Sequence, residues 1–472
     1  MNRRDFLRVG STAALAGVAR RASAQPAQRP NILFCISDDQ SWAHTGASGD
    51  RVVQTPTFDR IAREGVLFTH AFCAAPSCTP SRGSILTGQM FWRLAEGGNL
   101  WSTLPSRFPV YPDLLEAAGY HVGLMGKGWG PGDFKPGGRT RNPAGPGYRS
   151  FDEFLKTVPA DRPFCFWYGS NDPHRPYEKG SGLASGKRIE DVQVPPFLPD
   201  DPEVRSDILD YYFEIERFDR QVGQMVALLE AAGRLDDTIV VITSDNGMPF
   251  PRSKANLYEY GTRLPLAVRW PREVKSGRAI HDFVSFTDYA PTLLEAAGLN
   301  PPPEMTGRSF LDLLTGTKSG RVDPKRSRVF TGRERHAWCR EGGLGYPCRA
   351  LRTRRYLYIR NFRPERWPAG DPEGYGDIDG SPSKSFMMAH RDDPKVAPLF
   401  ALAFAKRPAE ELYDLEKDPS EFVNVADRPG YADTRRKLAA ELQEYLTATN
   451  DPRARGEGDF WDETEYYGQR PT

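Results

Sequence analysis

The sequence predicts an α/β fold: a large, mostly parallel mixed sheet sandwiched by helices, with a smaller antiparallel sheet subdomain near the C-terminus. Up to residue 325, short apolar runs alternate with segments of helical periodicity. This order is typical of a sheet that is built from strand–helix–strand units and covered on both faces. From residue 326 onward, apolar and polar residues alternate instead, which indicates antiparallel strands.

The first apolar run, residues 31–36, reads NILFCI and ends in Ser37, Asp38 and Asp39. A mostly apolar run without alternation predicts a central strand buried on both faces. Ligands of open α/β sheets bind at the carboxyl edge of such strands. Two adjacent aspartates repel each other unless a cation lies between them, so this strand end is a candidate cation site. A solvated turn is the alternative.

The order of helix, strand and polar residues recurs along the chain. We expect further helices and strands within residues 55–72, 111–128, 164–177, 206–233 and 238–247. Polar residues again follow the expected strands, namely Lys127, His174, Asp245 and Asn246. Their positions predict that they share one edge of the sheet with the two aspartates.

The chain divides into three parts by pattern. Residues 1–24 place Arg3 and Arg4 before a mildly apolar segment and an Ala-Ser-Ala sequence, which indicates a twin-arginine signal peptide. We therefore expect a periplasmic or secreted protein and the twin-arginine translocase as a partner. Residues 28–325 would form the larger, catalytic domain. Residues 326–472 would form the antiparallel subdomain, with a long loop at 363–393 and a terminal helix at 431–446.

Composition excludes some classes of protein. Of the 472 residues, 39% are hydrophobic, which is enough for a sizeable core. Lys plus Arg number 63 and Asp plus Glu number 62, so the net charge of +1 argues against a nucleic-acid partner. An anionic ligand would need a local basic patch. The six cysteines have irregular spacing, which argues against a zinc site, and Cys339 and Cys348 are the candidates for a disulfide.

The segment CTPSRGSILTG, residues 78–88, predicts the start of a helix with Ser81 as the candidate N-cap. Cys78 then lies near the helix N-terminus, where the dipole and free N–H groups favour negative charge. A lone cysteine is by default a buried structural residue. The residues around Cys78 therefore decide how it is interpreted.

Cys78, Pro80 and Arg82, followed by Leu-Thr-Gly, resemble the signature of the type I sulfatases, a branch of the alkaline-phosphatase superfamily. The resemblance extends over about residues 30–450 and implies an alkaline-phosphatase-like fold. It also implies that a formylglycine-generating enzyme oxidises Cys78 to formylglycine. The hydrated aldehyde would use one hydroxyl to attack the sulfur of a sulfate ester or sulfamate. The other hydroxyl would then lose its proton and release sulfate.

Three carboxylates and one amide oxygen form a hard ligand set that suits Ca²⁺ or Mg²⁺ rather than zinc, and we expect Ca²⁺. The resemblance assigns this ion to Asp38, Asp39, Asp245 and Asn246, together with the modified Cys78. It implies four further site residues: Arg82 to steady the hydrated aldehyde, Lys127 and Lys254 to bind sulfate oxygens, and His174 to protonate the leaving group.

Residues 194–223 and 244–266 resemble more closely the N-sulfoglucosamine sulfohydrolases, or sulfamidases, and their bacterial relatives. This implies hydrolysis of the S–N bond of N-sulfoglucosamine in heparan-type chains. Trp129 is a departure, since many sulfatases have a histidine there. We expect the substrate to bind a basic group in the second sheet, unless that group is only an exposed basic face; its members are Arg333, Arg335 and His336, with Arg349 and Arg352 nearby.

Three other functions remain open. The protein could be an O-sulfatase acting on another sulfated polysaccharide, or a phosphonate or phosphodiester hydrolase with the same nucleophile and metal set. It could also be a catalytically silent glycan-binding homologue, which the replacement at Trp129 would fit. In each sulfatase reading the substrate is a sulfated saccharide, and the sequence leaves a monomer and a homodimer equally open.

Overall fold

The computed structural model describes residues 29–470, and its largest element is a seven-stranded mixed sheet. The strand order is β4-β5-β1-β6-β8-β2-β9. β4, β5, β1 and β6 are parallel neighbours, whereas β8 is antiparallel to both β6 and β2. The predicted sheet is therefore confirmed, with these bounds: β1 Asn31–Ser37, β2 Val66–Phe68, β4 His121–Gly126, β5 Phe164–Gly169, β6 Thr238–Ser244, β8 Leu266–Arg269 and β9 Arg278–Ile280.

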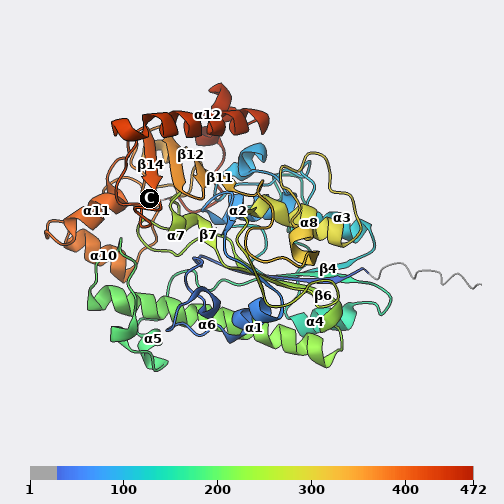
Figure 1. Ribbon diagram of the computed structural model, residues 1–472. Coiled ribbons are helices and arrows are strands. Elements are labelled where there is room, and N and C mark those ends of the chain that lie inside the picture. Colours follow the sequence, from blue (N-terminus) through green and yellow to red (C-terminus); the bar gives the residue numbers. More distant parts are fainter. Residues whose placement is uncertain (1–28, 471–472) are drawn as a thin grey trace, which may run out of the picture.

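Helices cover both faces of this sheet (Figure 1). On one face lie α1 (Pro56–Glu64), α4 (Phe151–Thr157) and the long α6 (Pro202–Ala231). On the other lie α2 (Cys78–Thr87), α3 (Tyr111–Ala117) and α8 (Tyr289–Ala296). Successive residues of β1 point to opposite faces, so Leu33 and Cys35 pack in the first layer while Ile32, Phe34 and Ile36 pack in the second.

β1 lies at the centre of the parallel part, and all seven of its residues are buried. Its partners are β5 on one side and β6 on the other, with Ile36 opposite Gly169 and Ser37 opposite Ser244. β4 adds the next parallel strand, with Gly126 opposite Gly169. Because the four strands are in register at their carboxyl ends, the residues that follow them meet at one edge.

A four-stranded antiparallel sheet forms the second unit of structure, as predicted, with α12 (Ala432–Ala448) lying over it (Figure 1). Its strands are β11 Arg328–Arg333, β12 Cys348–Thr353, β13 Tyr356–Asn361 and β14 Glu410–Asp414. A short three-stranded sheet contains β3 Ala71–Phe72, β7 Arg263–Leu264 and β10 Val284–Ser285. The remaining helices are α5 Ser181–Ala184, α7 Glu259–Thr262, α9 Leu311–Thr315, α10 Pro382–Ala389, α11 Ala397–Phe404 and α13 Phe460–Glu463.

Three local expectations are wrong. The helix of the cysteine motif begins at Cys78 itself with Ser77 at the N-cap, and the Ser81 hydroxyl instead donates to the carbonyl oxygen of Asp245 (2.5 Å). The expected loop at 363–393 contains α10, which Ser381 caps through its side chain. Cys339 and Cys348 are free thiols, because Cys339 donates to the Asp377 carboxylate (3.2 Å) while Cys348 begins β12.

The twin-arginine segment, residues 1–24, lies outside the described residues. Within residues 29–470, none of the helices combines the length and the apolar character needed to cross a bilayer. The division into domains at residues 325 and 326 stays a prediction.

Candidate active site

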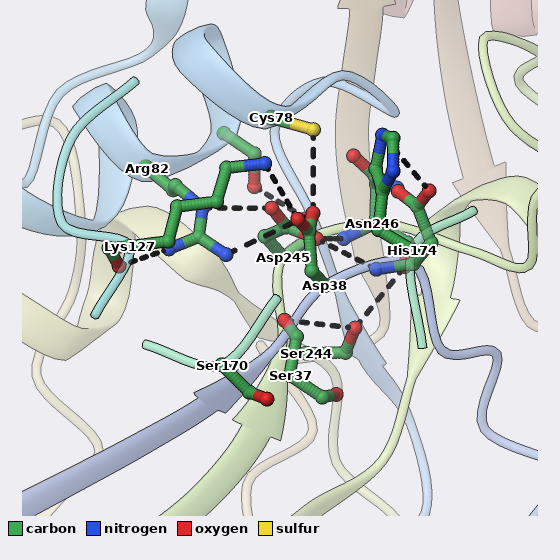
Figure 2. Close-up of polar contacts among 12 residues, drawn as sticks. Ser37, Asp38, Cys78, Arg82, Lys127, Ser170, His174, Ser244, Asp245 and Asn246 are labelled. Atoms are coloured by element: carbon green, nitrogen blue, oxygen red, sulfur yellow. Dashed lines mark hydrogen bonds and ion pairs between the residues drawn. The ribbon is translucent and has the colours of Figure 1, made fainter. Parts of the chain in front are cut away.

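The carboxyl ends of β1, β4, β5 and β6 and the N-terminus of α2 converge on one cluster of polar side chains (Figure 2). Backbone hydrogen bonds continue beyond the strands: Lys127 N–H donates to Gly169 (2.7 Å) and Asp245 N–H to Ser37 (3.2 Å). Asp38 N–H likewise donates to the carbonyl of Asp172 (2.9 Å). These bonds continue the backbone pairing beyond the strand ends and so position the residues that follow them.

The predicted metal ligands meet at the centre of this cluster. Ligand atoms of Asp38, Asp39, Cys78 and Asp245 all lie within 4.8 Å of one another. All three carboxylates are at most 1% exposed. The Oδ1 atom of Asn246 is buried and accepts no hydrogen bond from the described residues.

The charges of the cluster fit a bound cation. Burial, together with the neighbouring Asp38 carboxylate, raises the pKa of Asp245 to about 6. A bound cation would reduce the repulsion among the three crowded carboxylates and would give the amide oxygen of Asn246 a partner. An all-oxygen set of this kind suits Ca²⁺ or Mg²⁺. The residues present therefore fit the ion that the sequence predicts.

Cations surround the carboxylates on the outer side. Lys127 Nζ lies 2.6 Å from Asp38 Oδ2, and Arg82 Nε lies 2.7 Å from Asp245 Oδ2. Burial alone would raise the pKa of Asp38, but Lys127 and the other cationic neighbours together outweigh it and hold the pKa well below its usual range. Arg82 also donates through Nη1 to the carbonyl oxygen of Lys127 (2.7 Å), while its buried Nη2 has no hydrogen-bond partner among the described residues. The same Nη2 atom lies 3.9 Å from Asp38 Oδ1, so the fully buried guanidinium offsets negative charge on two of the carboxylates.

Cys78 lies at the first position of α2, 3.5 Å from Asp38 through its sulfur atom. It is 2% exposed, and burial raises the pKa of its thiol well above the usual value. A buried, protonated thiol is a poor nucleophile. Cys78 in its unmodified form is therefore unsuited to the reaction, and a modifying enzyme has little access to it in the folded chain.

His174 and Lys254 lie on the other side of Asp39. Lys254 Nζ is 2.7 Å from Asp39 Oδ2 and 3.1 Å from His174 Nε2, and His174 Nδ1 is 2.6 Å from the carbonyl oxygen of Arg175. The carbonyl can only accept, so Nδ1 carries a proton and the ring orientation is defined. About a third of the His174 side chain is exposed, which leaves it open to a ligand.

Asp379 is a site residue that sequence reasoning missed. Its Oδ2 atom lies 2.9 Å from Lys254 Nζ. Burial would lower the pKa of Lys254, but the carboxylates of Asp379 and Asp39 outweigh it and raise the pKa above its usual value. Asp379 belongs to the segment that was expected to be only a loop, and no local pattern connects it to Lys254.

We expect Asp379→Asn to lower kcat/KM for sulfate release by roughly 10- to 100-fold, as is common when a supporting hydrogen-bond partner in a site is lost. The amide keeps the shape but removes one of the two charges that orient Lys254. Steady-state kinetics would measure this. Asp392→Asn, whose side chain is 98% exposed, is the matched control and should behave as the parent protein. Equal activity of the two variants would contradict a role for Asp379.

Trp129, which replaces the usual histidine, does not line the site. Its side chain is 3% exposed and packs in the core layer that contains α2 and α3. Its indole nitrogen has no hydrogen-bond partner among residues 29–470. The site therefore lacks an imidazole at this position, and the tryptophan fills space behind α2.

The expected substrate-binding group lies inside the protein. Arg333, Arg335 and His336 are at most 4% exposed, so they form no open basic face. Arg333 donates to the carbonyl oxygen of Pro368 (2.8 Å) and Arg335 to that of Thr464 (2.8 Å). His336 Nδ1 lies 2.8 Å from the hydroxyl of Ser77, and burial lowers its pKa to about 3, so it stays neutral. Their direct contact with substrate stays a prediction, and their burial argues against it.

Arg349 also has a structural role, because it is fully buried between Asp451 (2.6 Å) and Glu334 (2.7 Å). Arg349→Ala would leave two buried carboxylates without this partner, and we expect it to destabilise the protein by about 3–5 kcal/mol. Urea unfolding would measure the change. Arg328→Ala, which removes a half-exposed pair with Glu441, should cost less than about 1 kcal/mol. A similarly small loss of stability in both variants would contradict a structural role for Arg349.

Comparison with known proteins agrees with this geometry. The sequence profile of the Sulfatase family matches residues 30–132 and 148–299, more than half of the chain, including the strand ends and the cysteine motif. The chain belongs to the sulfatase family. A second profile, the C-terminal region of N-sulphoglucosamine sulphohydrolase, matches residues 252–369. The protein is thus a sulfatase-family hydrolase, a family that typically uses formylglycine and a metal ion.

Curated relatives cover most of this sulfatase. An ulvan-active sulfatase of Formosa agariphila is 28% identical over 440 residues, which span 90% of this chain and 81% of that protein. Human N-sulphoglucosamine sulphohydrolase is 29% identical over 478 residues, which span 89% of this chain and 91% of that protein. The two identities are nearly equal, so they do not separate the two substrates.

Solved structures share the fold at lower identity. One, described in complex with its substrate D-glucosamine-2-N,6-O-disulfate, has a TM-score of 0.67 and 20% identity, and the match covers 93% of this chain and all of that one. The phosphonate monoester hydrolase of Agrobacterium radiobacter has a TM-score of 0.64 and 19% identity, and the match covers 89% of this chain and 96% of that one. Both likenesses concern the fold alone.

Proposed function

We propose that this sulfatase hydrolyses the sulfamate bond of N-sulfoglucosamine in heparan-type glycans, with formylglycine at position 78 and a bound Ca²⁺. The observation that supports this most is the match of residues 252–369 to the C-terminal region of N-sulphoglucosamine sulphohydrolase. That stretch contains Lys254 beside His174 and the strands β11 and β12. The reaction would convert a sulfamate and water into a free amine and sulfate.

The cluster has a position for each part of this reaction. When present, formylglycine supplies a hydrated aldehyde with one hydroxyl to attack sulfur and one through which sulfate is released. Asp38, Asp39, Asp245 and Asn246 would hold Ca²⁺, which supplies positive charge for the sulfate oxygens. Lys127, which lines the cavity beside Asp38, would bind a sulfate oxygen, and the buried Arg82 beside Asp245 would add positive charge behind the site.

His174 is placed to donate the proton that the leaving amine needs. Its ring is oriented by Arg175 and its Nε2 atom faces Lys254 and the exposed side of the cluster. Lys254, held between Asp39 and Asp379, keeps a positive charge next to this nitrogen. Because Lys254 Nζ can only donate, His174 Nε2 accepts from it here, so the ring would take up a proton at Nε2 before passing it to the amine as the S–N bond breaks.

O-sulfate hydrolysis is the second candidate, and the 28% identity to the ulvan-active sulfatase supports it. The same groups would then protonate an alkoxide instead of an amine. The phosphonate hydrolase and the catalytically silent binder remain alternatives, because the former shares the fold and Trp129 leaves no imidazole beside α2.

The proposal is tested with protein that was coexpressed with a formylglycine-generating enzyme. Mass spectrometry of the tryptic peptide containing Cys78 would measure conversion. Sulfate release would then be compared for N-sulfoglucosamine, O-sulfated ulvan oligosaccharides and an aryl phosphonate. Preference for the sulfamate supports the proposal, and preference for the ulvan oligosaccharides makes it an O-sulfatase. Faster phosphonate cleavage, or no turnover by fully converted protein, would refute sulfatase function.

We also propose export through the twin-arginine translocase to the periplasm or the medium. The support is the sequence of residues 1–24. Replacing both Arg3 and Arg4 with lysine should retain the protein in the cytoplasm, as cell fractionation would show. Unchanged export would contradict this route.

A further inference from the structure

The cavity at the active site is larger than a sulfate group needs. It has a volume of about 440 Å³, and Asp38, Lys127 and His174 of the cluster are among its lining residues. Outside the cluster it is also lined by Trp101, Asn171, Asp172, Glu214 and Arg217. A cavity of this size accommodates a small organic molecule. The cavity therefore has room for the group that carries the sulfate as well as for the sulfate itself.

Arg217, Glu214 and Asp172 are polar residues that line this cavity outside the cluster. Arg217 contacts Glu214 (2.8 Å) and Asp172 (3.2 Å). The side chains of the two acidic residues are at most 11% exposed, whereas nearly half of the Arg217 side chain is exposed. Buried carboxylates thus hold an accessible guanidinium in place. This arrangement offers both hydrogen-bond donors and acceptors to a ligand.

The balance of charge indicates what kind of group fits here. Two carboxylates face one guanidinium, so this part of the cavity does not attract a second anion strongly. Burial, together with the neighbouring Asp172, raises the pKa of Glu214 to about 7. Near neutral pH this carboxyl group can donate a hydrogen bond as well as accept one. Hydroxyl groups, which also do both, are the matching partners.

An aromatic side chain forms another part of the cavity, and the C-terminal segment holds it there. Trp101 has a φ of +55°, in the left-handed region, and its carbonyl oxygen accepts from Tyr467 N–H (2.8 Å). Gly468 packs so closely that a methyl group on it would lie 2.8 Å from the indole ring. Arg335 binds the carbonyl oxygens of Thr464 (2.8 Å) and Glu465 (3.2 Å). Arg335 therefore supports the cavity indirectly, through this segment.

We propose that Trp101, Asn171, Glu214 and Arg217 form a subsite for the pyranose ring that bears the scissile sulfate, here called the ring subsite. Trp101 packs against the apolar face of the ring, while Glu214 and Arg217 bind its hydroxyl groups. The ring subsite extends the proposed function, on which it rests for the choice of a sulfated saccharide. It also moves substrate recognition away from the buried Arg333 and His336.

The first test uses protein in which Cys78 has been converted to formylglycine. It compares kcat/KM for N-sulfoglucosamine with kcat/KM for 4-nitrophenyl sulfate, which lacks the pyranose ring. Arg217→Ala should lower the ratio of the two kcat/KM values by roughly 10- to 100-fold, the usual effect of losing hydrogen bonds to a charged group. Arg220→Ala is the matched control, because Arg220 is exposed three residues further along α6 and does not line the cavity. An equal ratio in both variants would overturn the proposal.

Two further variants test the chemistry of the ring subsite. Trp101→Ala should raise KM for the saccharide, and Trp101→Phe, which keeps an aromatic face, should restore most of the loss. Glu214→Gln should weaken saccharide binding, because the amide cannot replace every hydrogen bond of the carboxyl group. If the cavity instead received a second anionic group, removal of this negative charge would tighten binding, and the proposal would be wrong.

Binding without turnover separates this inference from the proposed function. In protein carrying Cys78→Ala, calorimetry would measure affinity for N-sulfoglucosamine, N-acetylgalactosamine 6-sulfate and sulfated ulvan oligosaccharides. A loss of about tenfold or more on adding Arg217→Ala, with none on adding Arg220→Ala, supports the ring subsite even if converted protein releases no sulfate. Absence of binding for all three saccharides, or equal affinities in the two variants, would overturn it.

Discussion

Cys78→Ala is expected to abolish sulfate release, with a loss of roughly 10⁴-fold or more, because it removes the precursor of the nucleophile. Cys78 begins α2, faces Asp38 and is almost fully buried. Alanine is smaller and tolerated at a helix start, so folding should be retained. Sulfate release by ion chromatography and unfolding by circular dichroism would measure the two properties.

Cys78→Ser tests separately whether the residue at position 78 is needed to release the sulfate group. A serine hydroxyl can attack sulfur once, but it lacks the second hydroxyl that allows release. We therefore expect a single turnover, with one sulfate group retained on the peptide that contains position 78. Cys339→Ala, at a thiol outside the cluster, should remain active. Normal multiple turnover by either variant at position 78 would show that the nucleophile is elsewhere.

Asp245→Asn is expected to weaken Ca²⁺ binding by roughly 100-fold or more, since loss of even an outer-shell partner costs 10- to 100-fold. Asp245 lies between Arg82 and the backbone N–H of Asp39, so it is held at the centre of the proposed ligand set. Asparagine keeps the shape and removes the charge. Calorimetry of chelator-treated protein with added Ca²⁺ would measure the affinity, in converted and unconverted protein alike.

The loss of Ca²⁺ affinity in Asp245→Asn should also be visible in the thermal stability of the protein. Ca²⁺ that binds only the folded protein raises Tm, and Asp245→Asn should reduce that increase. Asp219→Asn is the control, because Asp219 is also a buried carboxylate but accepts hydrogen bonds from Thr57 and Phe58 at the start of α1. Its Ca²⁺ affinity should match that of the parent. Equal affinities of the Asp245 and Asp219 variants would contradict the ligand set.

The parts of the site that lie directly after central strands were accessible to sequence reasoning. Parallel central strands are buried on both faces, so residues 31–36 and 238–244 appear as continuous apolar runs. Their parallel pairing brings Asp38 and Asp245 to one edge. The cysteine motif added the chemistry, and its resemblance to sulfatases added the roles.

The basic residues in the second sheet that we predicted to bind substrate are buried, which the sequence did not indicate. Arg333 and Arg335 have the composition of an anion-binding surface, and charge is usually exposed. Here backbone carbonyl oxygens and buried carboxylates neutralise such side chains inside the protein, as for Arg349 between Asp451 and Glu334. A linear pattern contains no information on partners that lie 100 residues away.

The sequence by itself determined the order of strands and helices, the position of the candidate nucleophile and the acidic residues at strand ends, because these depend on local apolar runs and a short motif. Only the tertiary structure decided that Asp379 contacts Lys254, that Trp129 lies in the core, and that the C-terminal segment packs on Trp101. Those contacts join distant segments, and their geometry results from packing of the whole chain.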